Sequence, residues 1–299
     1  MLSLEQLNMF VIAADEGSFS ACARKTGKVQ SAVSHGINTL EIDLNVSLFD
    51  RSTRHPTLTP AGERLYRLAK GLLIQAKELE KTAQAISQQQ ETRLTLAVDD
   101  GLLLPEVYDL LINVEQRFPT LEIELISLTS TDMAIDVAQG EIDLGIMFSE
   151  VEAAKQIDFC FIGHVEYVAV CHPQFPLAEH QAITTTALLP YRQIAVRGRN
   201  KRESSLLLSM ASHTWWCSSY AHVLALVNRQ IGWAYLPYFM VQPLIDKGLL
   251  VNMRMAFDHI TWSVPVDLIY AKGANQGPVF RFITTALKQL YSQRQQRLP

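Results

Sequence analysis

A regular repeat of leucine and alanine between residues 65 and 86 limits the possible folds of this chain more than any other feature. Apolar residues recur there at alternating spacings of four and three, at Leu65, Ala69, Leu72, Ala76, Leu79, Ala83 and Ile86. This heptad spacing predicts one long helix whose apolar stripe pairs with a second copy of itself, so these seven residues are the predicted dimerisation set. A helix packed against its own domain is the alternative.

Three shorter helices are predicted before the repeat. The first is amphipathic and ends at Gly17, and Ser18 caps a second helix that continues to about Lys25. The third extends from about Gln30 to Leu44, with its apolar residues on one face and a polar face opposite. Two short helices joined by a glycine-containing turn are typical of a helix-turn-helix.

The chain changes character twice after the third helix. Residues 48–51 and 56–59 indicate two short strands around a turn, which would form a wing. A polar run at residues 87–93 indicates a linker, and beyond it strands alternate with helices. This alternation predicts an α/β fold with a largely parallel sheet. The predicted domains are residues 1–60, a linker helix at 61–91 and an α/β domain at 92–299.

The polar face of the third helix carries the side chains that a DNA-reading helix needs. Gln30, Ser31, Ser34 and His35 lie in its first turns, from which amide, hydroxyl and imidazole groups reach base edges. Basic residues that would contact phosphates flank this helix at Arg24, Lys25 and Lys28 and lie on the wing at Arg51 and Arg54.

The total charge does not favour nucleic acid. The chain has a net charge of −4, and residues 1–66 carry six basic against seven acidic residues. The DNA hypothesis therefore depends on where the charges cluster, and a merely solvated polar helix face is the alternative.

Five blocks of sequence, taken in order, resemble the N-terminal signature of LysR-type transcriptional regulators. They are Gly17–Ala23, Gln30–Ser34, Leu40–Glu41, Leu48–Arg51 and Leu58–Gly62. The resemblance implies a winged helix-turn-helix that binds double-stranded promoter DNA, a linker helix that pairs two subunits, and a two-lobed effector domain like a periplasmic binding protein. The DNA-binding residues that follow are Arg24, Lys28, Gln30, Ser31, Ser34, His35, Arg51, Arg54 and Thr59.

The resemblance also divides the effector domain. Lobe I would comprise residues 92–162 and 266–299 and lobe II residues 163–265, with the chain crossing near Ile162 and Val266. A small-molecule effector would lie between the lobes and act allosterically. Its predicted contacts are Asp99, Asp100, Gly101, Thr129, Ser130, Thr131, Ser219, Tyr220 and His222. Homodimers or homotetramers are expected, with RNA polymerase as a further partner.

Three residues depart from the family pattern in and around the third helix. His35 stands where arginine is common, and Val29 replaces the usual Ser or Thr helix cap. Gly36 lowers the helix propensity by about 1 kcal/mol relative to alanine. These departures concern the operator sequence rather than the DNA-binding role.

Two adjacent carboxylates, Asp99 and Asp100, stand where the family often has small hydroxyl or neutral residues. They suggest an effector with an amine, amidine or nitrogen heterocycle, whose N–H groups a carboxylate accepts. The alternative is that one acid caps the positive end of the following helix. A basic cluster at residues 197–202 is expected to be a solvated turn, with an anion or partner site as the alternative.

Other function classes lack their signatures. No nucleotide-binding, hydrolase or zinc-protease motif occurs, so neither an enzyme nor a cofactor is predicted. The cysteines, Cys22, Cys160, Cys171 and Cys217, have no metal-ligand spacing and are expected to be buried free thiols, with a redox pair of Cys160 and Cys171 as the alternative. Without a signal peptide or a bilayer-length apolar run, a cytoplasmic protein is expected. A solute-binding or enzymatic α/β protein is the competing hypothesis.

Overall fold

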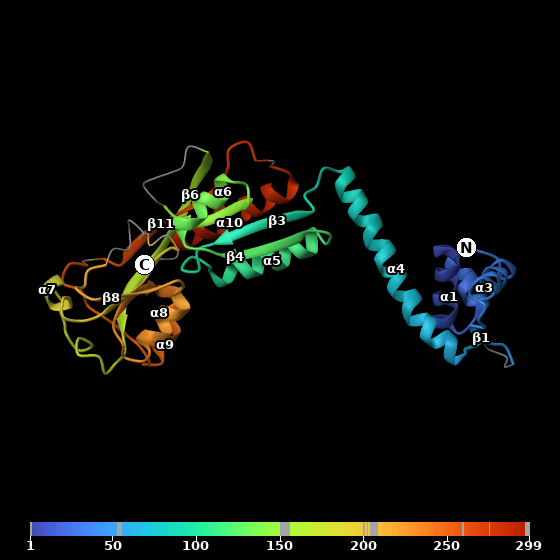
Figure 1. The fold of residues 1–299 in the computed structure, drawn as a ribbon, viewed down its shortest axis with the longest axis horizontal. Coiled ribbons are helices and arrows are strands. Elements are labelled where there is room, and N and C mark those ends of the chain that lie inside the picture. The colour runs from blue at the N-terminus through green and yellow to red at the C-terminus, as the bar shows by residue number, and fades with distance from the viewer. Residues whose placement is uncertain are drawn as a thin grey trace. The chain divides into compact units, whose positions relative to one another are not determined.

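The computed structural model describes residues 2–52, 56–149, 156–199, 201, 203, 209–258, 260–274 and 276–296. The chain forms two compact units, residues 1–88 and 89–299 (Figure 1). Each unit has its own hydrophobic core. The division falls inside the polar run at residues 87–93. No helix in the described ranges combines the length and apolarity that a membrane span requires.

The first unit begins with three short helices. They are α1 (Leu4–Glu16), α2 (Phe19–Thr26) and α3 (Gln30–Leu44). Ser18 caps α2 by accepting a hydrogen bond from the Ala21 amide, and Gly17 ends α1 in the left-handed conformation at φ 60°. The helix-turn-helix predicted from the sequence is therefore present.

The buried face of α3 packs against α1. Val33, Ile37 and Leu40 are fully buried on this face. Gly36 lies on the same face, and a Cβ atom at this position would come within 2.4 Å of the Met9 Cε atom. The glycine that lowers the helix propensity of α3 therefore lets α3 and α1 approach closely.

A small two-stranded sheet follows α3. Strands β1 (Phe49–Asp50) and β2 (Thr57–Leu58) pair antiparallel, with Phe49 opposite Leu58. The Phe49 ring packs edge-to-face on Phe10 and Phe19, with centroids 5.7 and 5.2 Å apart. This is the wing expected from the sequence, and Arg54, a predicted DNA contact, lies outside the described residues.

Helix α4 (Pro60–Ser87) divides the leucine–alanine stripe between two environments. Leu65 and Ala69 belong to the core of the first unit, where Ala69 is only 3% exposed. Leu72, Leu79 and Ile86 are exposed, Leu79 to 72%. The first two members thus pack within their own unit, as the alternative interpretation holds, and the later leucines and Ile86 have their side chains in solvent.

The second unit contains one seven-stranded sheet. Its first part comprises β3 (Arg93–Val98), α5 (Pro105–Arg117), β4 (Glu122–Ser127), α6 (Ser130–Ala138) and β5 (Leu144–Phe148). Strands β4, β3 and β5 are parallel neighbours. Alternate residues of β3 contribute to two hydrophobic clusters, one packed with α5 and α10 (Pro278–Gln296) and the other with α6. Helices therefore cover both faces of the sheet.

Two long strands connect this part to the rest of the unit. β6 (Ile157–Cys171) and β11 (Trp262–Ala271) pair antiparallel, and β11 also pairs antiparallel with β5. The expectation of a largely parallel sheet is therefore wrong: the sheet is mixed, because β11 runs antiparallel to both of its neighbours, β5 and β6. Their register shifts between Val266 and Asp267, the place where the sequence analysis sets the crossing between lobes.

The remaining elements lie between β6 and β11 in the sequence. They are α7 (Thr185–Leu188), β7 (Gln193–Val196), β8 (Thr214–Cys217), α8 (Tyr220–Val227), β9 (Ala234–Pro237), α9 (Tyr238–Asp246) and β10 (Val251–Asn252). Strands β9 and β10 pair antiparallel with β6, and β7 pairs parallel with β8. All four cysteines are free, and burial raises the pKa of the Cys171 thiol to about 12, which keeps it protonated.

Candidate DNA interface and effector site

The outer face of α3 presents the side chains that the sequence assigns to DNA. Gln30, Ser31 and His35 are exposed and Ser34 is half-buried. The Ser20 hydroxyl of α2 donates to Gln30 Oε1 at 2.9 Å, which orients this amide. Val29 precedes the helix without a side-chain capping hydrogen bond, so no side chain of its own satisfies the first amides of α3.

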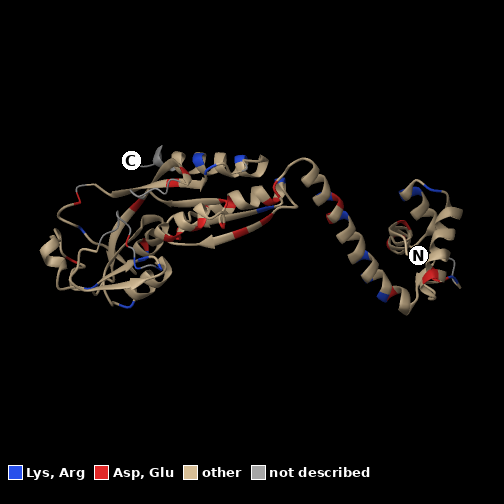
Figure 2. Ribbon diagram, turned by 45° about the horizontal axis from the view of Figure 1, so that its top comes forward, with Lys and Arg blue, Asp and Glu red and all other residues tan. Residues whose placement is uncertain are grey.

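Two of the predicted phosphate-binding lysines have acidic partners within the unit. Lys28 Nζ lies 2.6 Å from Glu5, and Lys25 Nζ lies 2.7 Å from Glu16. Arg24 is exposed beside them. Exposed ion pairs contribute little, so a phosphate can compete for these ammonium groups. Acidic and basic residues are also interspersed along α4 (Figure 2).

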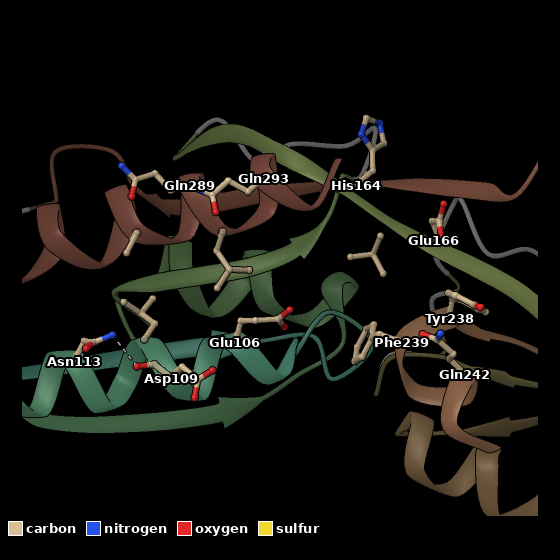
Figure 3. Close-up of a pocket in the computed structure, with 14 residues that line it drawn as sticks. Glu106, Asp109, Asn113, His164, Glu166, Tyr238, Phe239, Gln242, Gln289 and Gln293 are labelled. Atoms are coloured by element: carbon tan, nitrogen blue, oxygen red, sulfur yellow. Dashed lines mark hydrogen bonds between the residues drawn. The ribbon is translucent and has the colours of Figure 1, made fainter. Parts of the chain in front are cut away.

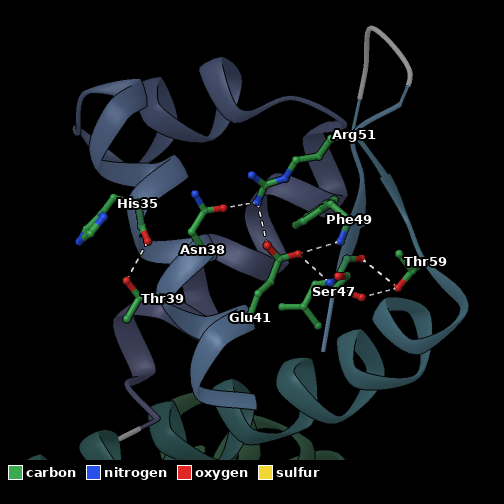
Figure 4. Close-up of polar contacts among 9 residues, drawn as sticks. His35, Asn38, Thr39, Glu41, Ser47, Phe49, Arg51 and Thr59 are labelled. Atoms are coloured by element: carbon green, nitrogen blue, oxygen red, sulfur yellow. Dashed lines mark hydrogen bonds and ion pairs between the residues drawn. The ribbon is translucent and has the colours of Figure 1, made fainter. Parts of the chain in front are cut away.

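Arg51 connects the wing to α3 (Figure 4). Its guanidinium donates to Asn38 Oδ1 and, at 2.8 Å, to Glu41 Oε2, and it lies 5.7 Å from the centroid of the Phe19 ring. Glu41 Oε1 accepts the backbone amides of Leu48 and Phe49 at 2.7 and 3.2 Å. Arg51 thus has a positioning role that the sequence analysis missed, beside the predicted phosphate contact.

Thr59 is engaged in the fold of the first unit. Its hydroxyl donates to the Ser47 carbonyl at 2.7 Å and accepts the Gly62 amide at 2.9 Å as the cap of α4 (Figure 4). No hydroxyl hydrogen is left to donate to a phosphate. The geometry therefore gives Thr59 a structural role, unlike the DNA contact expected from the sequence.

Asp99, predicted to contact the effector, is 3% exposed and fully engaged within the protein. Its Oδ2 accepts the amide and the hydroxyl of Ser130, both at 2.7 Å, and its Oδ1 accepts the Gly101 amide at 3.2 Å. Burial raises the pKa of Asp99 to about 7, against these hydrogen bonds. Asp99 therefore holds the start of α6, a different helix from the one that the capping alternative named.

Asp100 reaches an element far along the chain. Its Oδ2 accepts the Tyr220 amide at 2.9 Å, at the N-terminus of α8. Burial, the largest cause, raises the pKa of Asp100. This contact joins the loop after β3, in predicted lobe I, to α8, in predicted lobe II. It brings together Asp100, Gly101 and Tyr220 of the predicted effector set.

A second contact joins the same two parts of the unit. The Arg199 amide donates to Asp132 Oδ2 at 2.8 Å, and its guanidinium lies 3.7 Å from both Asp132 and Asp136 on α6. Thr129 donates to the same Asp132 oxygen at 3.0 Å. The basic cluster at residues 197–202 thus supplies one partner for α6, while Arg202 lies outside the described residues.

The comparisons with known proteins settle the family. Residues 4–63 match the bacterial regulatory helix-turn-helix proteins of the lysR family, and residues 87–291 match the LysR substrate binding domain. The chain belongs to the LysR family. It is therefore a DNA-binding transcription regulator with a separate effector-binding domain, as predicted.

Individual relatives of this LysR-family regulator match along nearly their whole length. It is 32% identical to the HTH-type transcriptional regulator AceR of Acinetobacter baumannii, over 94% of this chain and 95% of that protein. The fold resembles a C206 mutant of Corynebacterium glutamicum OxyR, with a TM-score of 0.57, 21% identity and coverage of 97% and 93%. It also resembles CrgA of Neisseria meningitidis, with a TM-score of 0.54, 21% identity and coverage of 97% and 99%.

The remaining predicted effector residues of this LysR-family regulator lie near α6 and α8. Ser219 caps α8 by accepting the His222 amide at 3.4 Å, and the His222 side chain is exposed. Thr131 lies 3.3 Å from Thr129. Tyr167 was not among the predicted effector residues. It is 1% exposed and lies edge-to-face with Tyr220, with the two ring centroids 6.1 Å apart. No local motif marks Tyr167, because it lies within the long strand β6.

A separate hollow of about 640 Å³ lies beside the crossing strands of this LysR-family regulator (Figure 3). It is bordered by α5, α10, the middle of β6 and the start of α9, including Glu106, Glu166 and Tyr238. None of the predicted effector residues lines it.

Proposed function

We propose that this regulator reads its operator with α3 in the major groove, where Gln30, Ser31, Ser34 and His35 face base edges. The observation that carries the proposal is the division of α3 into a fully buried apolar face and an exposed polar face. Arg24, Lys28 and Arg51 would contact the backbone, together with Arg54. A recognition helix uses the N-terminal part of such a face.

Footprinting of the full-length protein on fragments selected from its own genome tests this function. We expect a bounded footprint with two half-sites, because paired helix-turn-helix units read two half-sites about one helical turn or a multiple of it apart. Arg24→Ala should weaken binding to operator and random DNA alike, whereas Ser31→Ala should weaken operator binding selectively. Uniform or absent protection contradicts the proposal.

Subunit pairing through α4 is the second part of the proposal. The exposed residues Leu72, Leu79 and Ile86 remain spaced by seven after the first turns of α4 join the core, which supports a homodimer. Pairing of such dimers would give a homotetramer, and RNA polymerase would be contacted at the promoter. Sedimentation of the full chain measures the oligomeric state directly.

The effector is proposed to bind between the two lobes of residues 92–299, beside Asp100. Because Asp99 is enclosed by Ser130 and Gly101, a nitrogen-containing effector would use Asp100 as its acceptor. Binding would change how the lobes pack and so the angle of the paired DNA-binding units. A thermal-shift screen of metabolites, repeated with Asp100→Asn, tests this site, since a ligand of the native state raises its stability.

The cellular setting completes the proposal. The protein would act in the cytoplasm as a regulator and not as an enzyme, because the relatives it matches are transcriptional regulators. Cell fractionation with an antibody to the full chain checks the location, and a membrane or exported pool would contradict it.

A further inference from the structure

The Tyr167 hydroxyl lies buried in the second unit and makes no hydrogen bond of ordinary length and angle among the described residues. Its interaction with the Tyr220 side chain falls short of such a bond. The Tyr167 ring lies edge-to-face with Phe148 and Tyr220, at centroid distances of 5.6 and 6.1 Å. A buried hydroxyl without a partner is uncommon in proteins and calls for a ligand, water or rearrangement. We call the region formed by Asp99, Asp100, Gly101, Tyr167 and Tyr220 the interlobe seam.

The Tyr220 ring closes the interlobe seam. Tyr220 is 3% exposed, although it is the first residue of α8. A Cβ atom placed on Gly101 would lie 2.5 Å from both the Tyr220 ring and the Tyr167 hydroxyl. No space for a ligand remains at Gly101, so the ring occupies the place where the predicted contacts converge.

Backbone and side-chain contacts hold the ring in this position. Asp100 accepts the Tyr220 amide at 2.9 Å, at the end of α8 where the helix dipole favours a carboxylate. The Arg199 contact with Asp132 is a second link between the two predicted lobes. Gly198 is equally tight, because a Cβ atom there would lie 2.5 Å from the Thr131 hydroxyl.

We infer that Tyr220 is a gate that seals the interlobe seam, that Asp100 is its latch, and that the effector displaces Tyr220. This inference rests on the proposed effector role of the cleft. Once the latch opens, Asp100 needs a new N–H donor, and the Tyr167 hydroxyl, which lacks a good hydrogen bond already, still needs an acceptor. The effector therefore carries an N–H group beside a carbonyl or similar acceptor, as a primary amide or a lactam does.

Hydrogen exchange of the full-length protein tests the latch without any ligand. With Asp100→Ala, which removes the acceptor oxygens, we expect exchange in peptides covering residues 99–104 and 218–224 to speed up by about tenfold, because local opening governs exchange there. Asp109→Ala, at an exposed acid on α5, is the matched control and should leave both peptides unchanged. Unchanged exchange with Asp100→Ala would overturn the latch.

A wedge at Gly101 tests the gate. Gly101 does not have a positive φ, so alanine fits its backbone and acts only through its Cβ. Because this Cβ would also meet the Tyr167 hydroxyl, the comparison is made in the Tyr167→Phe background. There we expect Gly101→Ala to lower the melting temperature, and to have a much smaller effect once Tyr220→Ala has removed the ring. Equal effects with and without the ring would show that the Tyr220 ring does not fill the seam.

Three small probes test the chemical class. Benzamide has both an N–H donor and a carbonyl, whereas benzylamine lacks the acceptor and benzoate lacks the donor. Benzamide should bind Tyr220→Ala at least about tenfold more tightly than the wild type, because a closed gate reduces the competent population. Adding Tyr167→Phe should remove most of this gain.

These experiments distinguish failure of the Tyr220 gate from failure of the proposed effector role. Equal binding of the three probes would refute the ligand class, and equal binding of benzamide to wild type and Tyr220→Ala would refute the gate. If the gate behaves as expected but no metabolite affects the wild-type protein or its DNA binding, the proposed effector role fails and the gate stands.

Discussion

The outer face of α3 and the interlobe seam are both polar, but their polar groups are in opposite states. On α3, Gln30, Ser31 and His35 are exposed, and the contact from Ser20 to Gln30 lies at the surface. In the seam, Asp99 and Tyr220 are buried, and Asp99 already has three hydrogen-bond donors. If α3 reads DNA and the interlobe seam holds the effector, as proposed, the DNA-reading face can bind in the conformation seen here, whereas the effector site must open first.

The largest expected effect is the change with pH in the stability of the second unit, which contains the interlobe seam. The native pKa of Asp99 is raised to about 7, above its ordinary value of 3.8, so the native state favours the neutral acid. The contribution of Asp99 to the free energy of unfolding is therefore complete below about pH 4. It is lost as the pH rises through 7, and the loss is at most about 4 kcal/mol. Asp99→Asn should flatten this part of the stability profile.

The tryptophans make the measurement selective. Trp215, Trp216, Trp233 and Trp262 all lie in the second unit, so their fluorescence during denaturant unfolding reports that unit alone. Asp109→Asn is the control for an exposed carboxylate. If the free energy of unfolding changes with pH in the same way for Asp99→Asn and the wild type, ionisation of the buried Asp99 does not destabilise the second unit. The contrast with α3 would then weaken.

A charge on the exposed part of the stripe should have the next largest effect. If the α3 face is ready to bind, its use depends on pairing, and Leu79→Glu should dissociate the dimer because it places a carboxylate in an apolar contact. We expect operator affinity to fall by at least about 30-fold, as for a hot-spot residue. Sedimentation velocity checks the dimer, with Lys77→Glu beside the stripe as control. A dimer that survives Leu79→Glu would place the interface elsewhere.

Gln30→Ala tests the exposed polar face of α3. Loss of a bidentate contact to a base should weaken operator binding by about 1–3 kcal/mol and leave binding to random DNA unchanged. Ser20→Ala removes only the hydrogen bond that orients Gln30, so its effect should be smaller and of the same kind. Fluorescence anisotropy at two salt concentrations measures both variants. Equal losses on operator and random DNA would assign Gln30 to the backbone instead.

The smallest expected effect concerns the start of α3. Val29→Thr would supply the missing cap and raise the stability of the first unit by about 1 kcal/mol. Thermal melting of the full-length Val29→Thr and Val29→Ala variants, followed by the helical circular dichroism signal, measures this gain. No gain over Val29→Ala would show that water already satisfies these amides as well as a hydroxyl would.

The same contrast explains what the sequence could predict. The three N-terminal helices and the wing depend on local caps, turns and periodicity, and all of them are present. The pairing of Asp99 with Ser130 and of Asp100 with Tyr220 joins positions 31 and 120 residues apart, which no local pattern encodes. The two acids were identified, but their partners and the role of Tyr167 required the fold.

The stripe on α4 shows a similar limit. Its period predicted one continuous surface, but Leu65 and Ala69 are taken by the core because α1 covers the first turns of α4. A heptad repeat identifies which residues share a face and not what covers that face along its length.

The anchoring of α4 has a mechanical consequence. Ala69 is buried in the core of the first unit, and Lys70 lies 4.0 Å from Asp15 of α1, so the start of α4 and the three N-terminal helices move as one body. If α3 reads DNA as proposed, rotation of α4 about its axis would turn α3 by the same angle. One residue inserted in the later part of α4 would rotate the end of the helix by about 100°, and seven inserted residues would almost restore its original orientation.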